Sequence, residues 1–248
     1  MAVDDIHLPF GASCRFSRIS ANDGEEPSIE NLMEMLLEAA RLSFVVALWS
    51  VLITVPLALV SSTFLYDSRW RSLEIFFLLP LFLPPTVVGF ALLWILSPLT
   101  SFGSLIRQVF GPLVFTPAGT VLACVLVSFP LAFQACVVGL ARVEGVLKES
   151  AVMLGGTGVF NTIRVVWPQM QGALMIAILL VFSRVVGEFG ASVMVGGNIQ
   201  GHTQTLPLAI YQNSQNGDWA MAGAAALISV FLGVGAYMAL RWVETRSK

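Results

Sequence analysis

The stretch KESAVMLGGTGVFNTIRVVWP, residues 148–168, is charged and punctuated by glycine, in a chain that is otherwise mostly apolar. Residues 148–154 have the pattern of a short amphipathic helix, with Ala151 and Leu154 on one side and the charged pair on the other. The GGTG that follows predicts a sharp turn, because glycine adopts backbone conformations that other residues avoid. A second helical segment then leads into the next apolar run. Helix, turn and helix between two apolar runs predict an element that docks on a partner.

Composition indicates a membrane protein. Hydrophobic residues make up 56% of the 248 and charged residues 11%, whereas soluble proteins carry about 25% charged residues. A soluble domain of this length needs a polar surface that these residues cannot supply. The net charge of −2 is too small to indicate nucleic acid as a partner. We therefore expect an all-α, polytopic membrane protein.

Five apolar runs are each long enough to cross a bilayer, which takes about 20 residues. They predict a transmembrane domain over residues 31–248, with spans at about 41–65, 73–97, 118–140, 172–195 and 219–241. Residues 1–30 are polar and acidic and lack the apolar core of a signal peptide, so we expect a solvated tail. Lys and Arg gather in the loops after the first and third runs and after the fifth run. This distribution predicts a cytoplasmic C-terminus and an N-terminus outside.

The cysteines and histidines indicate neither a disulfide nor a metal site. Cys124 and Cys136 are about 18 Å apart along a helix, which is too far for a bridge. Cys14 lies in the polar tail. His202 has no second ligand at a suitable spacing. We expect free thiols, no metal and no cofactor.

The segment FLPPTVVGFALLW, residues 82–94, places Pro84 and Pro85 inside an apolar run. Proline removes a helical hydrogen bond and clashes with the preceding turn. In a membrane it is tolerated where neighbours or a cavity satisfy the freed carbonyls. The segment is thus either a kinked packing helix or a broken helix beside a translocation path, as transporters use.

Arg184 and Glu188 are charges deep within the fourth apolar run. At i and i+4 they share a face of a helix. Intramembrane charges are costly, and they usually face the bundle interior and serve function. The alternative is a structural ion pair that fixes helix packing.

The segment MVGGNIQGHTQTLPLAIYQNSQNGDWA, residues 194–220, is polar and free of Lys and Arg. Gly196 and Gly197 are candidate caps for the end of the fourth span. Asn198, Thr203 and Thr205 can offer hydrogen bonds at a polar rim. By itself the segment predicts a surface loop that docks a partner.

Residues 149–168 resemble the EAA motif in the permease subunits of binding-protein-dependent ABC importers. That motif reads E-A-A, three residues, G, nine residues, I-x-L-P. The residues at its fixed positions here are Glu149, Ser150, Ala151, Gly155 and Pro168. Serine, valine and tryptophan replace three residues of the motif, but its spacing is intact. The resemblance implies that this segment contains the coupling helix, which contacts a cytoplasmic ATPase.

Two further stretches resemble the molybdate, tungstate and sulfate permeases of that group. GEFGASVMVGGNIQGHTQTLPLAIY (187–211) is similar to their G-E-F-G, G-G-N-I-x-G and T-x-T-L segments. FLPPTVVGFALL (82–93) is similar to their second span. The GGNI and AIY segments, with the five-span length, favour the molybdate and tungstate members. The resemblance covers residues 40–242 and leaves out the tail.

The resemblance implies a type I importer. Its partners would be a second permease subunit, two cytoplasmic ABC ATPases, an external substrate-binding protein and the lipid of the inner membrane. The residues expected along the translocation path and gate are Arg184, Glu188, Phe189, Pro84 and Pro85. The loop residues Asn198, Thr203 and Thr205 are expected to face the binding protein. The chain has no G-x-x-x-x-G-K-[ST] segment, so we expect that ATP is hydrolysed by the partner and that the chain is not an enzyme.

Alternatives remain open at this point. A sulfate or thiosulfate permease would share most of these segments. A stand-alone secondary transporter would use Arg184 and Glu188 as substrate and proton site, although no inverted repeat is visible. A membrane enzyme would need paired carboxylates or a nucleophile set, and the sequence suggests neither. Which oxyanion is carried, and what the tail does, are left open.

Overall fold

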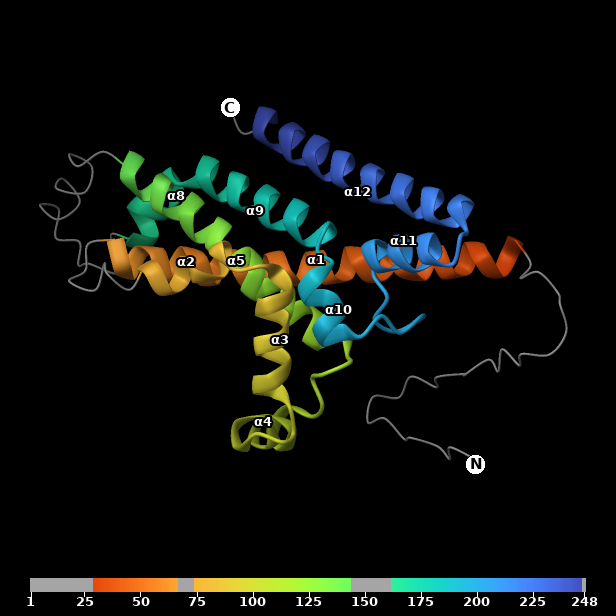
Figure 1. The fold of residues 1–248 in the computed structure, drawn as a ribbon. Helices are drawn as coiled ribbons and strands as arrows, with labels where there is room; N and C mark the ends of the chain where they lie inside the picture. Colours follow the sequence, from red (N-terminus) through yellow and green to blue (C-terminus); the bar gives the residue numbers. More distant parts are fainter. Residues whose placement is uncertain (1–28, 67–73, 144–161, 247–248) are drawn as a thin grey trace, which may run out of the picture.

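The computed structural model describes residues 29–66, 74–143 and 162–246, and this part of the chain is helical with short connections (Figure 1). Its elements in order are α1 (Ile29–Tyr66), α2 (Glu74–Phe82), α3 (Pro85–Leu96), α4 (Ser101–Phe110), α5 (Pro117–Arg142), the π-helical turn η2 (Thr162–Val166), α8 (Trp167–Gln169), α9 (Gln171–Val186), α10 (Gly190–Gly196), α11 (Leu206–Gln215) and α12 (Trp219–Arg246). The expected all-α fold is confirmed.

Three helices are long and apolar enough to cross a membrane: Asn31–Tyr66, Pro117–Arg142 and Trp219–Ala239. Two bent helix pairs, α2 with α3 and η2–α8 with α9, pass the same test when each pair counts as one span. The described residues therefore hold three to five candidate spans, and the five expected from the sequence match the upper number.

Helix α1 is longer than the span expected at 41–65. Its 38 residues extend about 57 Å, against about 30 Å for the apolar core of a bilayer. The additional N-terminal turns are held by packing, since Ala39 is buried in a cluster with Leu206 and Ala209 of α11 and Ala225 of α12. Tertiary packing therefore continues the helix beyond the apolar run.

The main core lies where α1, α5 and α9 pack together. Small buried residues on α1, among them Ala47 and Ala58, allow the close approach of α5. The ring of Phe77 from α2 stacks on Phe133 of α5 with ring centroids 5.4 Å apart, and Phe133 is fully buried. These contacts fix α5 as the central element against which the interrupted helices are placed.

The span expected at 73–97 is broken. Its two parts, α2 and α3, are bent by 115° relative to one another. Pro84 adopts an extended conformation with ψ of 136°, and Pro85 is the first residue of α3. Because both residues are prolines, neither can supply the N–H that a continuous helix needs. In Figure 1, α3 runs across the direction of α1 and carries α4 at its far end.

The span expected at 172–195 is also interrupted, which corrects the continuous helix assumed from its hydropathy. α9 ends at Val186 and α10 begins at Gly190. A glycine at 187 permits this break because it forms helices poorly. α10 ends at Gly196, and the residue that caps it, Gly197, has a left-handed φ of 77°, which confirms the predicted glycine cap.

Candidate functional site

The two helix breaks lie next to each other. A Cβ on Gly89 of α3 would stand 2.7 Å from the Cα of Ala191 in α10, and a Cβ on Gly190 would stand 3.0 Å from the backbone N of Thr86. The approach at Gly89 requires glycine, because a Cβ there would stand closer to the backbone than real Cβ atoms do, and a Cβ at Gly190 would be crowded. We call this contact between the first turns of α3 and α10 the junction.

An ion pair lies beside the junction. Arg184, in the last turn of α9, donates from Nη1 to Oε2 of Glu188, which lies in the break after that helix. The other carboxylate oxygen, Oε1, accepts the N–H of Ala191 at 2.7 Å. The predicted pairing of the two charges is thus confirmed, although α9 ends between them.

The two partners of this pair differ in exposure. The side chain of Glu188 is 2% exposed and that of Arg184 is 31% exposed. Both oxygens of Glu188 are occupied, whereas among the described residues the guanidinium of Arg184 bonds to Glu188 alone. A guanidinium has five N–H donors. Donors therefore remain on Arg184 for an anion, and the buried carboxylate offsets most of its charge.

The other residues expected along the path are placed differently. Pro85 lies at the junction, with its Cβ 3.2 Å from the position of a Cβ on Gly190, and Pro84 is exposed just before it. Phe189 packs on Tyr211 of α11, with ring centroids 5.1 Å apart. It also lines a shallow, open pocket of about 340 Å³ beside α11. The structure therefore brings Pro85 and the ion pair together and turns Phe189 towards α11.

Residues 197–205 do not form the open polar rim expected from the sequence. Thr203 is fully buried; its hydroxyl donates to the carbonyl of Gly196 at 2.6 Å and accepts the N–H of Ile199 at 3.0 Å. Thr205 is 5% exposed, and Asn198 donates to Gln212 at 2.8 Å. The hydroxyl of Thr203 bonds within the loop and the amide nitrogen of Asn198 bonds to α11, whereas Oγ1 of Thr205 and Oδ1 of Asn198 are buried without a hydrogen-bond partner among the described residues. Thr203 and Thr205 are therefore internal rather than surface residues.

The expected ATPase-coupling residues are mostly outside the described part of the chain. Glu149, Ser150, Ala151 and Gly155 belong to residues 144–161, and Pro168 lies exposed in α8. Of the thiols, Cys124 and Cys136 are free and buried in α5. The described ranges contain no group of three or more His, Cys, Asp or Glu side chains suited to a metal ion.

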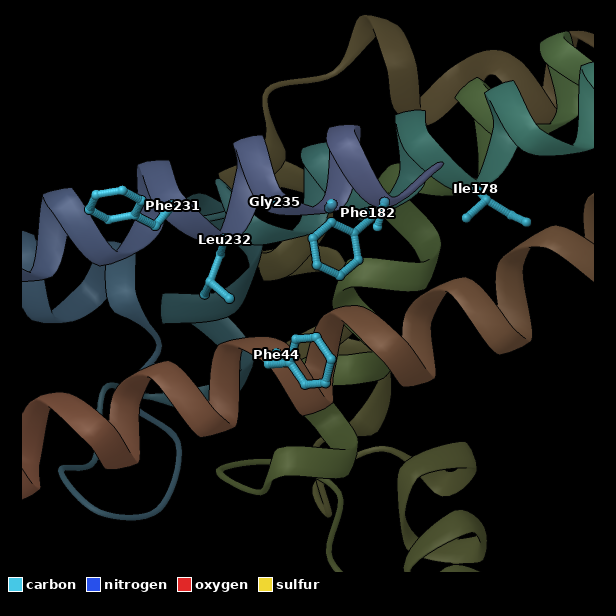
Figure 2. Close-up of a pocket in the computed structure, with 8 residues that line it drawn as sticks. Phe44, Ile178, Phe182, Phe231, Leu232 and Gly235 are labelled. Atoms are coloured by element: carbon cyan, nitrogen blue, oxygen red, sulfur yellow. The ribbon is translucent and has the colours of Figure 1, made fainter. Parts of the chain in front are cut away.

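A second open pocket, of about 380 Å³, lies between α1, α9 and α12 (Figure 2). Its lining is apolar and consists of Phe44, Ile178, Phe182, Phe231, Leu232, Gly235, Ala236 and Ala239. With no polar side chain it has nothing to offer an anion. The junction and its ion pair are therefore the better candidate site.

Replacing Gly89 should test whether the junction needs its close backbone contact. In Gly89→Ala the new methyl group meets the Ala191 backbone at 2.7 Å, so α3 and α10 must move apart. We expect a loss of about 1–3 kcal/mol, as for other overpacked sites, together with lower transport. Thermal unfolding of the purified complex measures the first effect.

Gly233→Ala in α12 is the matched control, because a Cβ there meets nothing within 4 Å. Alanine also has a higher helix propensity than glycine, so this variant should be at least as stable as the parent. Equal unfolding midpoints for the two variants would contradict the close contact at the junction.

Comparison with known proteins identifies the chain. No protein-family model matches it. A molybdenum transport system permease protein, ModB, from Mycobacterium tuberculosis is 36% identical over 219 residues, which are 85% of this chain and 80% of that protein. ModB from Haemophilus influenzae is 32% identical over 219 residues, 86% of this chain and 95% of that protein. The chain is an ABC transporter permease subunit.

The permease also resembles a sulfate transport system permease protein, cysT, from Nephroselmis olivacea, at 32% identity over 171 residues, 68% of this chain and 60% of that protein. Among solved structures, the MetNI methionine ABC transporter matches with a TM-score of 0.67 and 17% identity, over 91% of this chain and 100% of that one. A bacterial importer of alginate matches with a TM-score of 0.68 and 15% identity, over 85% and 80% of the two chains. These two structures support the importer permease fold.

Family membership settles two expectations. Permease subunits of ABC transporters lack ATPase activity, so this chain is not an enzyme. It is a multi-pass membrane protein of an importer rather than a stand-alone secondary transporter.

Proposed function

We propose that the permease passes a tetrahedral oxyanion, molybdate or tungstate, across the cell membrane. The observation that carries this proposal is the cation of Arg184, partly exposed beside two broken helices and held by the buried carboxylate of Glu188. Broken helices with polar groups at their ends are typical of transporter substrate sites. The molybdenum permeases among the relatives support the choice of anion.

The ion pair is better suited to letting an oxyanion pass than to holding it tightly. A bare arginine within the membrane would attract an anion strongly and hinder its release, because charges interact strongly at low dielectric. The carboxylate of Glu188 lowers this attraction while leaving donors on Arg184 free to bond. Under this proposal the external binding protein, and not the permease, holds the high-affinity site.

The proposed assembly has two copies of the permease, two cytoplasmic ATPases and one external binding protein. The ATPase would contact the coupling segment, from Glu149 to Gly155, with Pro168 at its end. The N-terminus would lie outside and the C-terminus in the cytoplasm, following the distribution of Lys and Arg. The binding protein would then meet residues 197–205, where Ile199 is 40% exposed.

Sulfate is the second candidate, since sulfate permeases are among the relatives. Molybdate, tungstate and sulfate are all tetrahedral dianions and differ chiefly in size. An arginine side chain bonds to any of them, so Arg184 itself does not select among the three.

ATP hydrolysis by the reconstituted complex distinguishes the candidates. The permease, its ATPase and its binding protein are placed in proteoliposomes, and molybdate, tungstate and sulfate are added in turn. We expect molybdate and tungstate to stimulate hydrolysis and to accumulate inside, because the binding protein presents only the anion that it encloses. Stimulation by sulfate alone would assign the permease to sulfate, and stimulation by none of the three would contradict oxyanion transport.

A further inference from the structure

Thr86 is a polar residue where the sequence is otherwise apolar. Between positions 75 and 96 every other side chain is aliphatic, aromatic, proline or glycine. Thr86 lies in the first turn of α3, directly after the two prolines, and its side chain is exposed. A single hydroxyl in an apolar run of this length can be recognised in the sequence. Whether Thr86 matters for function depends on which residues lie beside it.

The hydroxyl of Thr86 cannot bond to its own helix. Several other hydroxyls in the described helices donate to a carbonyl three or four residues earlier, as Ser128 does to Cys124 and Ser183 does to Leu180. The residues three and four positions before Thr86 are Leu83, in the break, and Phe82, the last residue of α2 beyond the 115° bend. Among the described residues Thr86 has no hydrogen-bond partner, so its O–H donor is free.

The junction places Thr86 beside the segment that carries the ion pair. A Cβ on Gly190 would stand 3.0 Å from both the Cγ2 and the N of Thr86. The next residue, Ala191, donates its N–H to the carboxylate of Glu188, which holds Arg184. Thr86 of α3 thus contacts Gly190 of α10, and the neighbouring Ala191 contacts the carboxylate of the ion pair. An unpartnered hydroxyl facing lipid would be costly, which favours a polar surrounding for Thr86.

We propose that Thr86 is a cargo-contacting residue that donates a hydrogen bond to the oxyanion while it passes Arg184. Every oxygen of a tetrahedral oxyanion accepts hydrogen bonds, so a neutral donor beside a cation can hold one oxygen as the guanidinium holds another. A hydroxyl adds this contact without adding charge, and release therefore stays easy. This inference rests on the proposed function, because it requires the junction to line the path of the anion.

The first test compares Thr86→Val, which keeps the shape and removes the hydroxyl, with Thr86→Ser, which keeps the hydroxyl. Proteoliposomes containing the whole complex receive binding protein loaded with molybdate, with sulfate in parallel, and the number of anions moved per ATP is measured. Thr86→Val should lower this ratio about three- to tenfold, as expected for one lost hydrogen bond. Thr86→Ser should restore it to within about twofold of the parent.

Ser183→Ala is the matched control. Ser183 is exposed and adjacent to Arg184, but its hydroxyl already donates to Leu180 at 3.2 Å. Its loss should leave the transport ratio unchanged. If Thr86→Val matches the parent while Arg184→Gln lowers transport, the role of Thr86 is refuted and the proposed path stands. If the parent complex moves no oxyanion, both proposals fall.

A labelling experiment tests the surroundings of Thr86 without relying on transport. In Thr86→Cys the new thiol should react with a charged methanethiosulfonate reagent, and molybdate should slow that reaction. Phe76→Cys on α2, where Phe76 is 71% exposed among apolar neighbours, should react only with an apolar maleimide. The parent complex measures the background, and both of its described thiols are buried. If Thr86→Cys behaves like Phe76→Cys, Thr86 faces lipid and the inference is wrong.

Discussion

Glu188→Gln should lower oxyanion uptake at least tenfold while leaving a less stable but assembled complex. Glutamine can still accept the N–H of Ala191, which now bonds to Oε1 at 2.7 Å. It cannot neutralise Arg184, and its amide N–H₂ would face a guanidinium that also only donates. The anion should then bind more tightly and leave more slowly, so that both the maximal rate and the apparent KM of uptake fall.

The cost in stability should be intermediate. Removing one partner of a fully buried pair costs about 3–5 kcal/mol, whereas an exposed pair contributes about 0.2–1 kcal/mol. Since Glu188 is buried and Arg184 is 31% exposed, we expect about 2 kcal/mol, seen as a lower unfolding midpoint of the purified complex.

The double variant Arg184→Gln with Glu188→Gln separates transport from packing. If the pair lines the path, the double variant should assemble and show altered oxyanion flux. If the pair only fixes helix packing, assembly should fail without a particular effect on flux. An assembled double variant that transports at the parent rate, with unchanged anion preference, would remove the ion pair from the path.

Gly155→Val should abolish uptake while the permease still inserts and pairs. Gly155 lies outside the described residues, and the expectation rests on its position in the coupling segment, where glycine permits a turn that a β-branched residue resists. ATP hydrolysis by the assembled complex should continue without moving the anion. Measuring hydrolysis and uptake in the same proteoliposomes gives the loss of coupling directly.

Gly172→Val is a suitable control for this experiment. Gly172 lies near the start of α9, and a Cβ there meets nothing within 4 Å, so the added side chain should leave coupling intact. Parent-level uptake by Gly155→Val would refute the assignment of the coupling segment.

Local features of the fold could be read from the sequence. Two adjacent prolines in an apolar run lack the N–H groups of a continuous helix, and α2 and α3 do separate at Pro84. Gly197 was recognisable as a cap because few other residues adopt its left-handed backbone. The pairing of Arg184 with Glu188 followed from their spacing. Each of these inferences depends on residues within one helical turn of each other.

Features that depend on distant contacts could not be read in this way. The meeting of the two breaks depends on Gly89 touching Ala191, about a hundred positions away. Likewise, Thr203 and Thr205 are polar residues in a polar segment, which indicates a surface, yet both are buried. For Thr203 the reason is a hydrogen bond to the carbonyl of Gly196, and no pattern in the sequence predicts this bond.

The hydrogen bonds of Thr203 have a mechanical consequence. They attach the loop to the end of α10, and the N–H of Phe115 fixes the same end from the other side, at 2.8 Å from the carbonyl of Val195. α10 has seven residues, so it is only about 10 Å long. At its opposite end Ala191 holds Glu188. We therefore expect a push on the loop to displace α10 as one short rigid element, and the displacement to reach the carboxylate of Glu188 without any helix having to bend.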